Sequence, residues 1–246
     1  MQISGEINKA FNDVLFSIIN PEGEIPDEIK YDPEKAMHIV FERIIALTEI
    51  NEIEKEIKII LDRLGTINGL LVKSYSIEEL VIGVKHYLIA WSTMKDLMVN
   101  LMNICFDLGI HETDLSYGVV MRNKKVKNSN IPKIVKAHQK TINVQYTDKQ
   151  RNDAIHRGKL LDDEINEFRA RYNVLNSRKY GLLNPEPISD EEFNKEQKKL
   201  NSELKNLVEL KKQAYSEHYK STITLNIELA RELAKVTANA VLNNRI

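Results

Sequence analysis

The sequence predicts an all-α protein, and three observations support this. Among 246 residues there are only nine glycines and six prolines, and scarce turn-forming residues favour a few long helices over many short strands. Apolar residues recur at steps of three and four positions, the spacing that gathers them on one face of a helix. Helix-start signals precede several of these segments. The composition, 42% hydrophobic and 29% charged, is typical of a globular chain that buries a core.

The N-terminal region is expected to form a helix followed by a linker. Residues 5–20 are expected to form a short amphipathic helix, and the stretch 21–33, which contains three prolines, is expected to be a linker. The apolar face of this helix comprises Ile7, Phe11, Val14, Leu15 and Ile18. We therefore expect two parts, an N-terminal helix with its linker over 1–32 and one helical bundle domain over 33–246.

Four long helices are expected to form that bundle. They span 33–64, 76–109, 148–176 and 190–242. The first opens on Asp32-Pro33, a capping residue before proline at the first helical position, and the last opens on Ser189 followed by three acidic residues. Antiparallel packing of four such helices gives a four-helix bundle with an additional short N-terminal helix.

The connections between these helices are less regular. Residues 110–130 are expected to be irregular, and a short helix is expected around 131–139, with Pro132 in its first turn. The last helix would measure roughly 75 Å at 1.5 Å per residue. That length exceeds its neighbours, so we expect it to bend or to project toward a partner.

Positive charge is concentrated in one part of the chain. The formal net charge is −1 and the sequence pI is about 6.6, which excludes a protein that binds polyanions over its whole surface. Between Val120 and Leu160, however, eleven Lys or Arg residues face only Asp148 and Asp153, a local charge of +9, and the remainder carries −10. Such a stretch indicates a local site for phosphate-bearing ligands; the alternative is a solvated loop and helix face.

Several classes of protein are excluded. Cys105 is the only cysteine, so a buried structural thiol is expected rather than a disulfide framework or a cysteine metal site. Glu217 is followed by Lys220 where a carboxylate metal site would require histidine, and we expect no metal and no cofactor. The N-terminus lacks the pattern of a secretory signal, and charged residues interrupt the apolar stretch 77–108. We therefore expect a cytoplasmic protein without a membrane span.

The most informative segment is Gln-Arg-Asn-Asp-Ala-Ile-His at 150–156. Asn152 and His156 are four residues apart and share a helix face, and the long side chain of Arg151 can bend back toward the imidazole. Histidine moves protons near neutral pH, arginine binds phosphate oxygens bidentately, and asparagine can orient either group. Phosphodiester chemistry is therefore expected, although the spacing also fits a solvated arginine beside a half-buried histidine.

The order Arg-Asn-x-x-x-His near the start of a helix, in an all-helical bundle, resembles the signature of the HEPN superfamily. That signature is an arginine, a polar residue, three further residues and a histidine. Arg151, Asn152 and His156 fill its positions without departure. The motif covers six residues, and the order of long helices extends the resemblance over most of 33–242.

The resemblance implies a metal-independent endoribonuclease whose two protomers pair around one cleft. RNA would be cleaved by attack of its 2′-hydroxyl on the adjacent phosphate, which excludes DNA as a substrate. His156 would act as general base or acid, Arg151 would bind the scissile phosphate, and Asn152 would be the polar support. RNA and a second copy of the chain are the implied partners.

The biological setting is also implied only by resemblance. A toxin or a phage-defence effector is expected, with a regulatory or antitoxin partner as a further expectation. One subtype is silenced by modification of a tyrosine two residues after the motif histidine. Here that position is Gly158, following Arg157, so control by this route is not expected.

Other residues are candidates for binding RNA. The RNA-binding set is Arg122, Lys124, Lys125, Lys127, Lys149, Arg157 and Lys159. His138 is a further candidate for backbone contact, and Tyr117 and Tyr146 are available for base stacking or belong to the edge of the core. His86 and Asp96 either tune His156 or lie on the outer stripe of their helix.

HEPN proteins that bind RNA or nucleotides without cutting also exist. The competing hypothesis is therefore a non-catalytic helical module for RNA binding, nucleotide binding or assembly.

Overall fold

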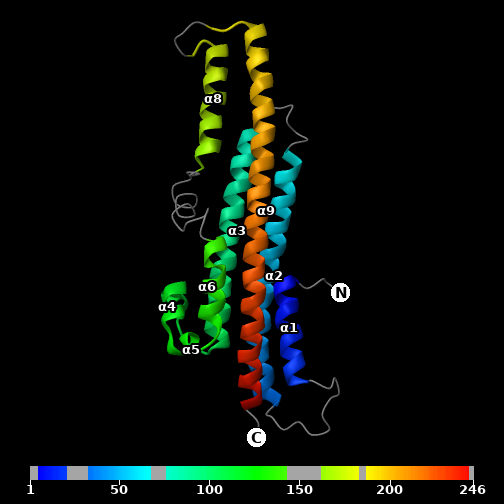
Figure 1. Cartoon of the computed structure of the whole chain (residues 1–246), viewed down its shortest axis with the longest axis vertical. Helices are drawn as coiled ribbons and strands as arrows, with labels where there is room; N and C mark the ends of the chain where they lie inside the picture. The colour runs from blue at the N-terminus through cyan, green and yellow to red at the C-terminus, as the bar shows by residue number, and fades with distance from the viewer. Residues whose placement is uncertain (1–4, 21–32, 68–75, 143–161, 183–186, 244–246) are drawn as a thin grey trace. The chain divides into compact units, whose positions relative to one another are not determined.

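The computed structural model describes residues 5–20, 33–67, 76–142, 162–182 and 187–243. Within these residues it contains eight α-helices, one 3₁₀ helix and no β-strand, which confirms the all-α class (Figure 1). The elements are α1 (Glu6–Ile19), α2 (Pro33–Thr66), α3 (Ser76–Cys105), η2 (Glu112–Asp114), α4 (Tyr117–Arg122), α5 (Lys124–Lys127), α6 (Ile131–Ile142), α8 (Asp163–Lys179) and α9 (Asp190–Asn243).

The chain forms two compact units. Unit 1 comprises 1–57, 90–145 and 218–246, and unit 2 comprises 58–89 and 146–217. Helices α2, α3 and α9 each contribute residues to both units. Within unit 1, α2 and α3 run in opposite directions, as do α8 and α9 within unit 2 (Figure 1). The division into 1–32 and 33–246 stays a prediction.

Helix α1 confirms the expected short N-terminal helix and packs on α2 within unit 1. Its Ile7, Ala10, Phe11 and Leu15 are buried. Gly5, the N-cap, has no side chain to accept from the first turn, and α2 supplies the acceptors instead. The Gly5 amide donates to Asn51 Oδ1 at 2.5 Å, and the Glu6 amide donates to Glu54 Oε1 at 3.2 Å.

Each unit has its own apolar core. In unit 1, α3 contributes bulky side chains and α9 contributes several alanines, which are small enough for helices to approach closely. The buried residues include Trp91, Met94, Leu101, Met102, Ala230, Leu233, Ala234 and Ala238. In unit 2, Tyr87 and Tyr215 are buried with ring centroids 4.8 Å apart, and the Tyr87 hydroxyl donates to the Tyr215 carbonyl at 3.2 Å.

Helix α3 ends at Cys105, earlier than the expected Gly109, because of a Schellman turn. The Leu108 amide donates to the Asn103 carbonyl at 3.0 Å, and the Asp107 amide donates to the Ile104 carbonyl at 3.1 Å. Asp107 has φ +47°, the left-handed conformation that this turn requires and that glycine usually provides. The next positive φ, +64°, falls on Gly109.

The expectation of irregular structure over 110–130 is wrong in part, because η2, α4 and α5 form there. Local caps stabilise these short helices: Ser116 Oγ accepts from the Val119 amide and Asn123 Oδ1 from the Lys125 amide. Val120 and Val126 are fully buried and fasten α4 and α5 to unit 1. The helix expected around 131–139 is confirmed as α6.

The expected helix over 148–176 does not run without a break. Asp162 has extended backbone, and its Oδ1 accepts from the Ile165 amide at 3.1 Å, so α8 begins at Asp163. The predicted last helix is confirmed as α9, and Ser189 Oγ accepts from the Glu192 amide at 3.1 Å as its cap. Helix α9 runs without interruption over 54 residues.

Candidate nucleic-acid interface

The predicted catalytic residues Arg151, Asn152 and His156 lie outside the described residues. The same holds for four neighbours that were expected to bind RNA or stack on bases, namely Lys149, Arg157, Lys159 and Tyr146. The roles assigned to these residues stay predictions. The described part of the basic stretch belongs to unit 1, and it allows the remaining candidates to be placed.

Arg122, Lys124, Lys125 and Lys127 lie on α4 and α5, and all four are exposed. The sequence folds this way because single apolar residues in the run point inward, notably Val126, while the basic residues around it stay in water. Helix α4 contacts α5, and α5 contacts α6. The basic run is therefore held as a compact group of short helices.

Lys125 has a structural partner that the sequence did not reveal. Its Nζ donates to the carbonyl oxygens of Phe106 at 3.0 Å and Asp107 at 2.7 Å, just beyond the end of α3. Carbonyls at a helix C-terminus carry partial negative charge, and a cation there is favourable. Lys125 thus fastens α5 to the end of α3.

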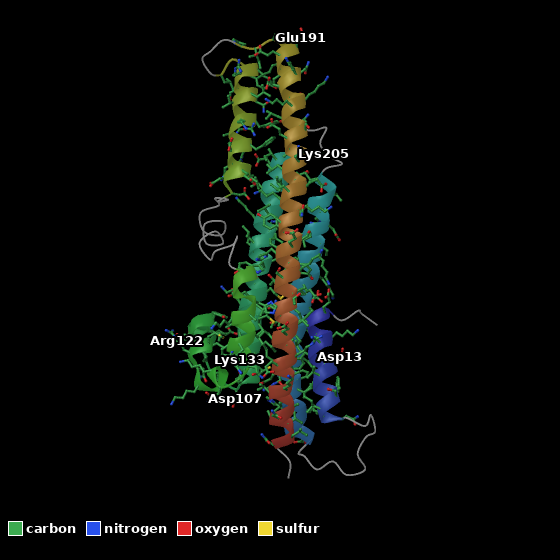
Figure 2. All side chains as sticks on the ribbon, viewed as in Figure 1. Asp13, Asp107, Arg122, Lys133, Glu191 and Lys205 are labelled. Carbon is green, nitrogen blue, oxygen red and sulfur yellow. The ribbon has the colours of Figure 1, made fainter. Side chains whose placement is uncertain are left out.

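Five other cations of this region have no such partner. Arg122, Lys124 and Lys127, with Lys133 and Lys136 of α6, are exposed and make no side-chain hydrogen bond or ion pair within the described residues. Figure 2 labels Arg122 and Lys133 on these helices. The sequence contains no Asp or Glu between 115 and 147. The region therefore presents positive charge without carboxylates of its own.

The carboxylates that α6 meets come from α9, within unit 1. His138 Nε2 lies 3.1 Å from Glu228 Oε2, and the Asn130 amide nitrogen donates to Glu232 Oε1 at 3.1 Å. The His138 side chain is 17% exposed. Its ring is thus engaged by a carboxylate, and it connects α6 to α9 rather than standing open to a ligand.

Tyr117 is the one Phe, Tyr or Trp residue of η2, α4, α5 and α6, and it is partly exposed at the start of α4. Partial burial raises the pKa of its hydroxyl. Lys95 Nζ lies 6.0 Å from its ring centroid, the outer limit of a cation–π contact.

His86 and Asp96 are exposed, which fits the outer stripe of α3.

Sequence reasoning missed a buried arginine next to the end of α3. Arg43 of α2 is 5% exposed, and its Nη2 donates to the Ile104 carbonyl at 2.9 Å. Cys105 lies beside it, and Thr237 Oγ1 is 3.6 Å from Cys105 Sγ. Cys105 is buried, as expected for a structural thiol, and this burial raises its pKa to about 11. The apolar spacing of α2 gave no signal for Arg43.

His218 of α9 was also missed. It is buried, and its ring meets Trp91 at a centroid distance of 5.1 Å in an edge arrangement. Burial lowers the pKa of His218 to about 4, so the ring is uncharged at neutral pH. The available signal was its position three residues after Tyr215, on the same buried stripe.

The described residues contain no group of three or more His, Cys, Asp or Glu side chains arranged to hold a metal ion. In the same residues, no helix combines the length and apolar character needed to cross a membrane.

Comparison with known proteins identifies one family. The family model described as Cthe2314-like HEPN matches residues 74–222, more than half of the chain, and this region includes the Arg-Asn-x-x-x-His motif. No curated protein matches. No solved structure matches either. The extent of the family match shows that the chain belongs to the HEPN family.

Proposed function

We propose that this protein is a metal-independent endoribonuclease of HEPN type. The observation that carries the proposal is that the family match over 74–222 encloses Arg151, Asn152 and His156 in the order of the family signature. The cationic residues of α4, α5 and α6 add a surface suited to phosphates.

The proposed reaction needs only these side chains and the RNA. His156 takes the proton of the 2′-hydroxyl, and the 2′-oxygen attacks the adjacent phosphorus. The bond from phosphorus to the 5′-oxygen breaks, and that oxygen leaves with a proton from a general acid. The products are a 2′,3′-cyclic phosphate and a 5′-hydroxyl. Arg151 stabilises the charge that develops on the phosphate, and Asn152 orients the pair.

The proposed assembly is a homodimer, in which a two-fold axis brings the motif of each protomer to one cleft. A histidine from each copy would then supply the base and the acid. RNA is the proposed substrate, DNA is not cleaved because it lacks the 2′-hydroxyl, and no cofactor takes part. We further propose a cytoplasmic toxin or phage-defence effector under a regulatory or antitoxin partner that does not act through residue 158.

The test is incubation of the purified full chain with total RNA and a tRNA pool in EDTA. We expect discrete fragments with cyclic-phosphate ends, and none from His156→Ala or Arg151→Ala. His38→Ala is a matched control, because His38 is an exposed histidine of α2 outside the motif. Cleavage that survives either motif substitution contradicts the assigned roles, and loss of wild-type cleavage in EDTA contradicts the metal-independent mechanism.

The second candidate is a HEPN module that binds RNA or nucleotides without cutting. The observation that favours it is the cationic surface of α4–α6, whose residues need no catalytic motif to bind phosphate. Intact RNA in all samples, together with retained RNA binding, would support this candidate over the ribonuclease.

A further inference from the structure

Five of the unmatched cations of unit 1 lie on three consecutive helices, of which α4 contacts α5 and α5 contacts α6. We define the α4–α6 cationic surface as Arg122, Lys124, Lys127, Lys133 and Lys136, all exposed and without side-chain partners among the described residues. Val120, Val126 and Ile131 are each fully buried beneath these helices. Each of the three helices therefore has its own buried apolar residue. The cationic side chains extend from helical backbone rather than from a linker.

No carboxylate among the described residues forms an ion pair with these five cations. Glu228 and Glu232 of α9 already contact His138 and Asn130. Lys125, the remaining basic residue of α5, donates hydrogen bonds to the carbonyls of Phe106 and Asp107. Five like charges left together repel one another and cost stability, and a polyanion placed on them relieves that cost.

The composition of the surface selects among polyanions. Proteins that hold single-stranded nucleic acid stack successive bases on several aromatic side chains. Here α4–α6 carry no Phe or Trp and one Tyr, Tyr117, and the ring of His138 is engaged by Glu228. In base-paired RNA the bases are hidden, and proteins contact phosphates and 2′-hydroxyls instead. Cations without aromatic partners therefore fit a folded RNA better than an unpaired strand.

We infer that the α4–α6 cationic surface binds the phosphate backbone of base-paired RNA, while Lys125 is a structural cation that holds the surface in place. This inference rests on the proposed function in that its ligand is RNA. It adds a binding step that uses residues separate from Arg151 and His156 and that does not depend on the base sequence.

The experiment measures binding of a fluorescein-labelled RNA hairpin to the full chain by anisotropy, at several KCl concentrations. All proteins carry His156→Ala, so that the RNA probe is not cleaved during the measurement. Binding is thus measured independently of whether the wild-type protein cleaves RNA. The test variant combines Arg122→Gln, Lys124→Gln and Lys127→Gln. Because each phosphate contact adds about one to the salt slope, we expect the slope to fall by about two to three and the affinity to fall at least roughly tenfold near 0.1 M salt.

The matched control combines Lys55→Gln, Arg171→Gln and Lys235→Gln. It removes the same net charge from cations that contact Glu52, Glu203 and Glu232. We expect its affinity and salt slope to stay close to those of the parent. An equal loss in both triple variants, or an unchanged salt slope in the test variant, overturns the inference.

Three further probes test the identity of the ligand. A hairpin with a different stem sequence is expected to bind within about twofold, and an unpaired strand of equal length is expected to bind more weakly. Tighter binding of the unpaired strand overturns the assignment to base-paired RNA. Polyglutamate is expected to displace the hairpin less effectively than unlabelled RNA of equal charge. Equal displacement overturns the assignment to RNA and indicates an acidic protein as the ligand.

Discussion

Two regions, the contact of α8 with α9 in unit 2 and the group α4–α6 in unit 1, accommodate positive charge in different ways. In unit 2, several cations of α8 and α9 meet carboxylates: Arg171 lies 2.8 Å from Glu203, Lys179 contacts Asp190, and Lys211 lies between Asp162 and Glu164 at 2.8 and 2.6 Å. Unit 1 also contains such pairs, Lys55 with Glu52 and Lys235 with Glu232. Its buried Arg43, however, donates to backbone carbonyls, Lys125 does the same, and α4, α5 and α6 carry no carboxylate of their own.

The difference shows that a count of lysines does not reveal their roles. Where carboxylates are interleaved on adjacent helices, cations join those helices at little net energy per exposed pair. Where they are absent, the same residue types either bind backbone or remain available to a ligand. Three predictions test this contrast, starting with the largest effect.

The largest effect is expected at acid pH in unit 1. Because burial lowers the pKa of His218 from 6.5 to about 4, the unfolded chain takes up this proton first. His218 therefore lowers the free energy of unfolding as the pH falls from 6.5 toward 4, by about 3 kcal/mol at the lower end. His218→Phe is expected to remove this part of the pH dependence, as measured by urea unfolding at several pH values.

The control for this prediction is His38→Gln, which changes an exposed histidine. Its unfolding free energy is expected to follow the wild-type pH profile. Parallel profiles for wild type and His218→Phe would show that His218 is not the buried neutral group of unit 1.

The next effect concerns the buried cation. Arg43→Met keeps an unbranched apolar side chain but removes the charged hydrogen bonds to the Ile39 and Ile104 carbonyls and the positive charge near Glu42 and the end of α3. We expect a loss of roughly 2 to 3 kcal/mol in the free energy of unfolding. Arg43→Lys, which keeps the charge, is expected to recover part of it. A loss well under 1 kcal/mol for Arg43→Met would contradict a structural role for this buried charge.

The smallest effects are expected in unit 2. Burial by itself lowers the pKa of Lys211, but hydrogen bonds and charges from Asp162 and Glu164 raise it above 10.5 overall. The ion pairs of Lys211 thus stabilise the fold below that pH and are lost only as the pH rises through the raised value. Lys211→Met is expected to cost about 1 kcal/mol at neutral pH.

Arg171→Gln is the exposed counterpart, since the Arg171 side chain is 49% exposed and forms its ion pair with Glu203 while lying 5.8 Å from the Phe168 ring centroid. Its cost is expected to stay under about 0.5 kcal/mol and to vanish in high salt. If the two substitutions cost the same in thermal and urea unfolding, the partial burial of Lys211 has no energetic consequence.

Most long helices could be predicted because their signals are local. Pro33 and Ser189 mark the starts of α2 and α9, and apolar spacing carries each helix onward. The end of α3 was misplaced because Asp107, not Gly109, takes the left-handed position of the terminal turn. The helix start at Asp163 was missed because an aspartate such as Asp162 also occurs inside helices. Its role as the N-cap of α8 shows only in the hydrogen bond that it accepts from the Ile165 amide.

The short helices and the internal roles of cations were harder to predict. Helices α4 and α5, six and four residues long, are too short to show periodicity, although Ser116 and Asn123 were readable as caps. The bonds of Lys125 reach residues 18 and 19 positions away, and no local pattern reveals such a contact. The motif at 150–156 was found from sequence alone, and its geometry lies outside the described residues.

The single, deeply buried cysteine has a practical consequence for labelling. Because the pKa of Cys105 is about 11 and its side chain is enclosed, very little reactive thiolate exists at neutral pH. The native chain therefore behaves as a nearly thiol-free background toward maleimide dyes. A cysteine introduced at the exposed position Asn128 would take up one fluorophore beside α5, and its emission would report on RNA arriving there without any change to the catalytic motif.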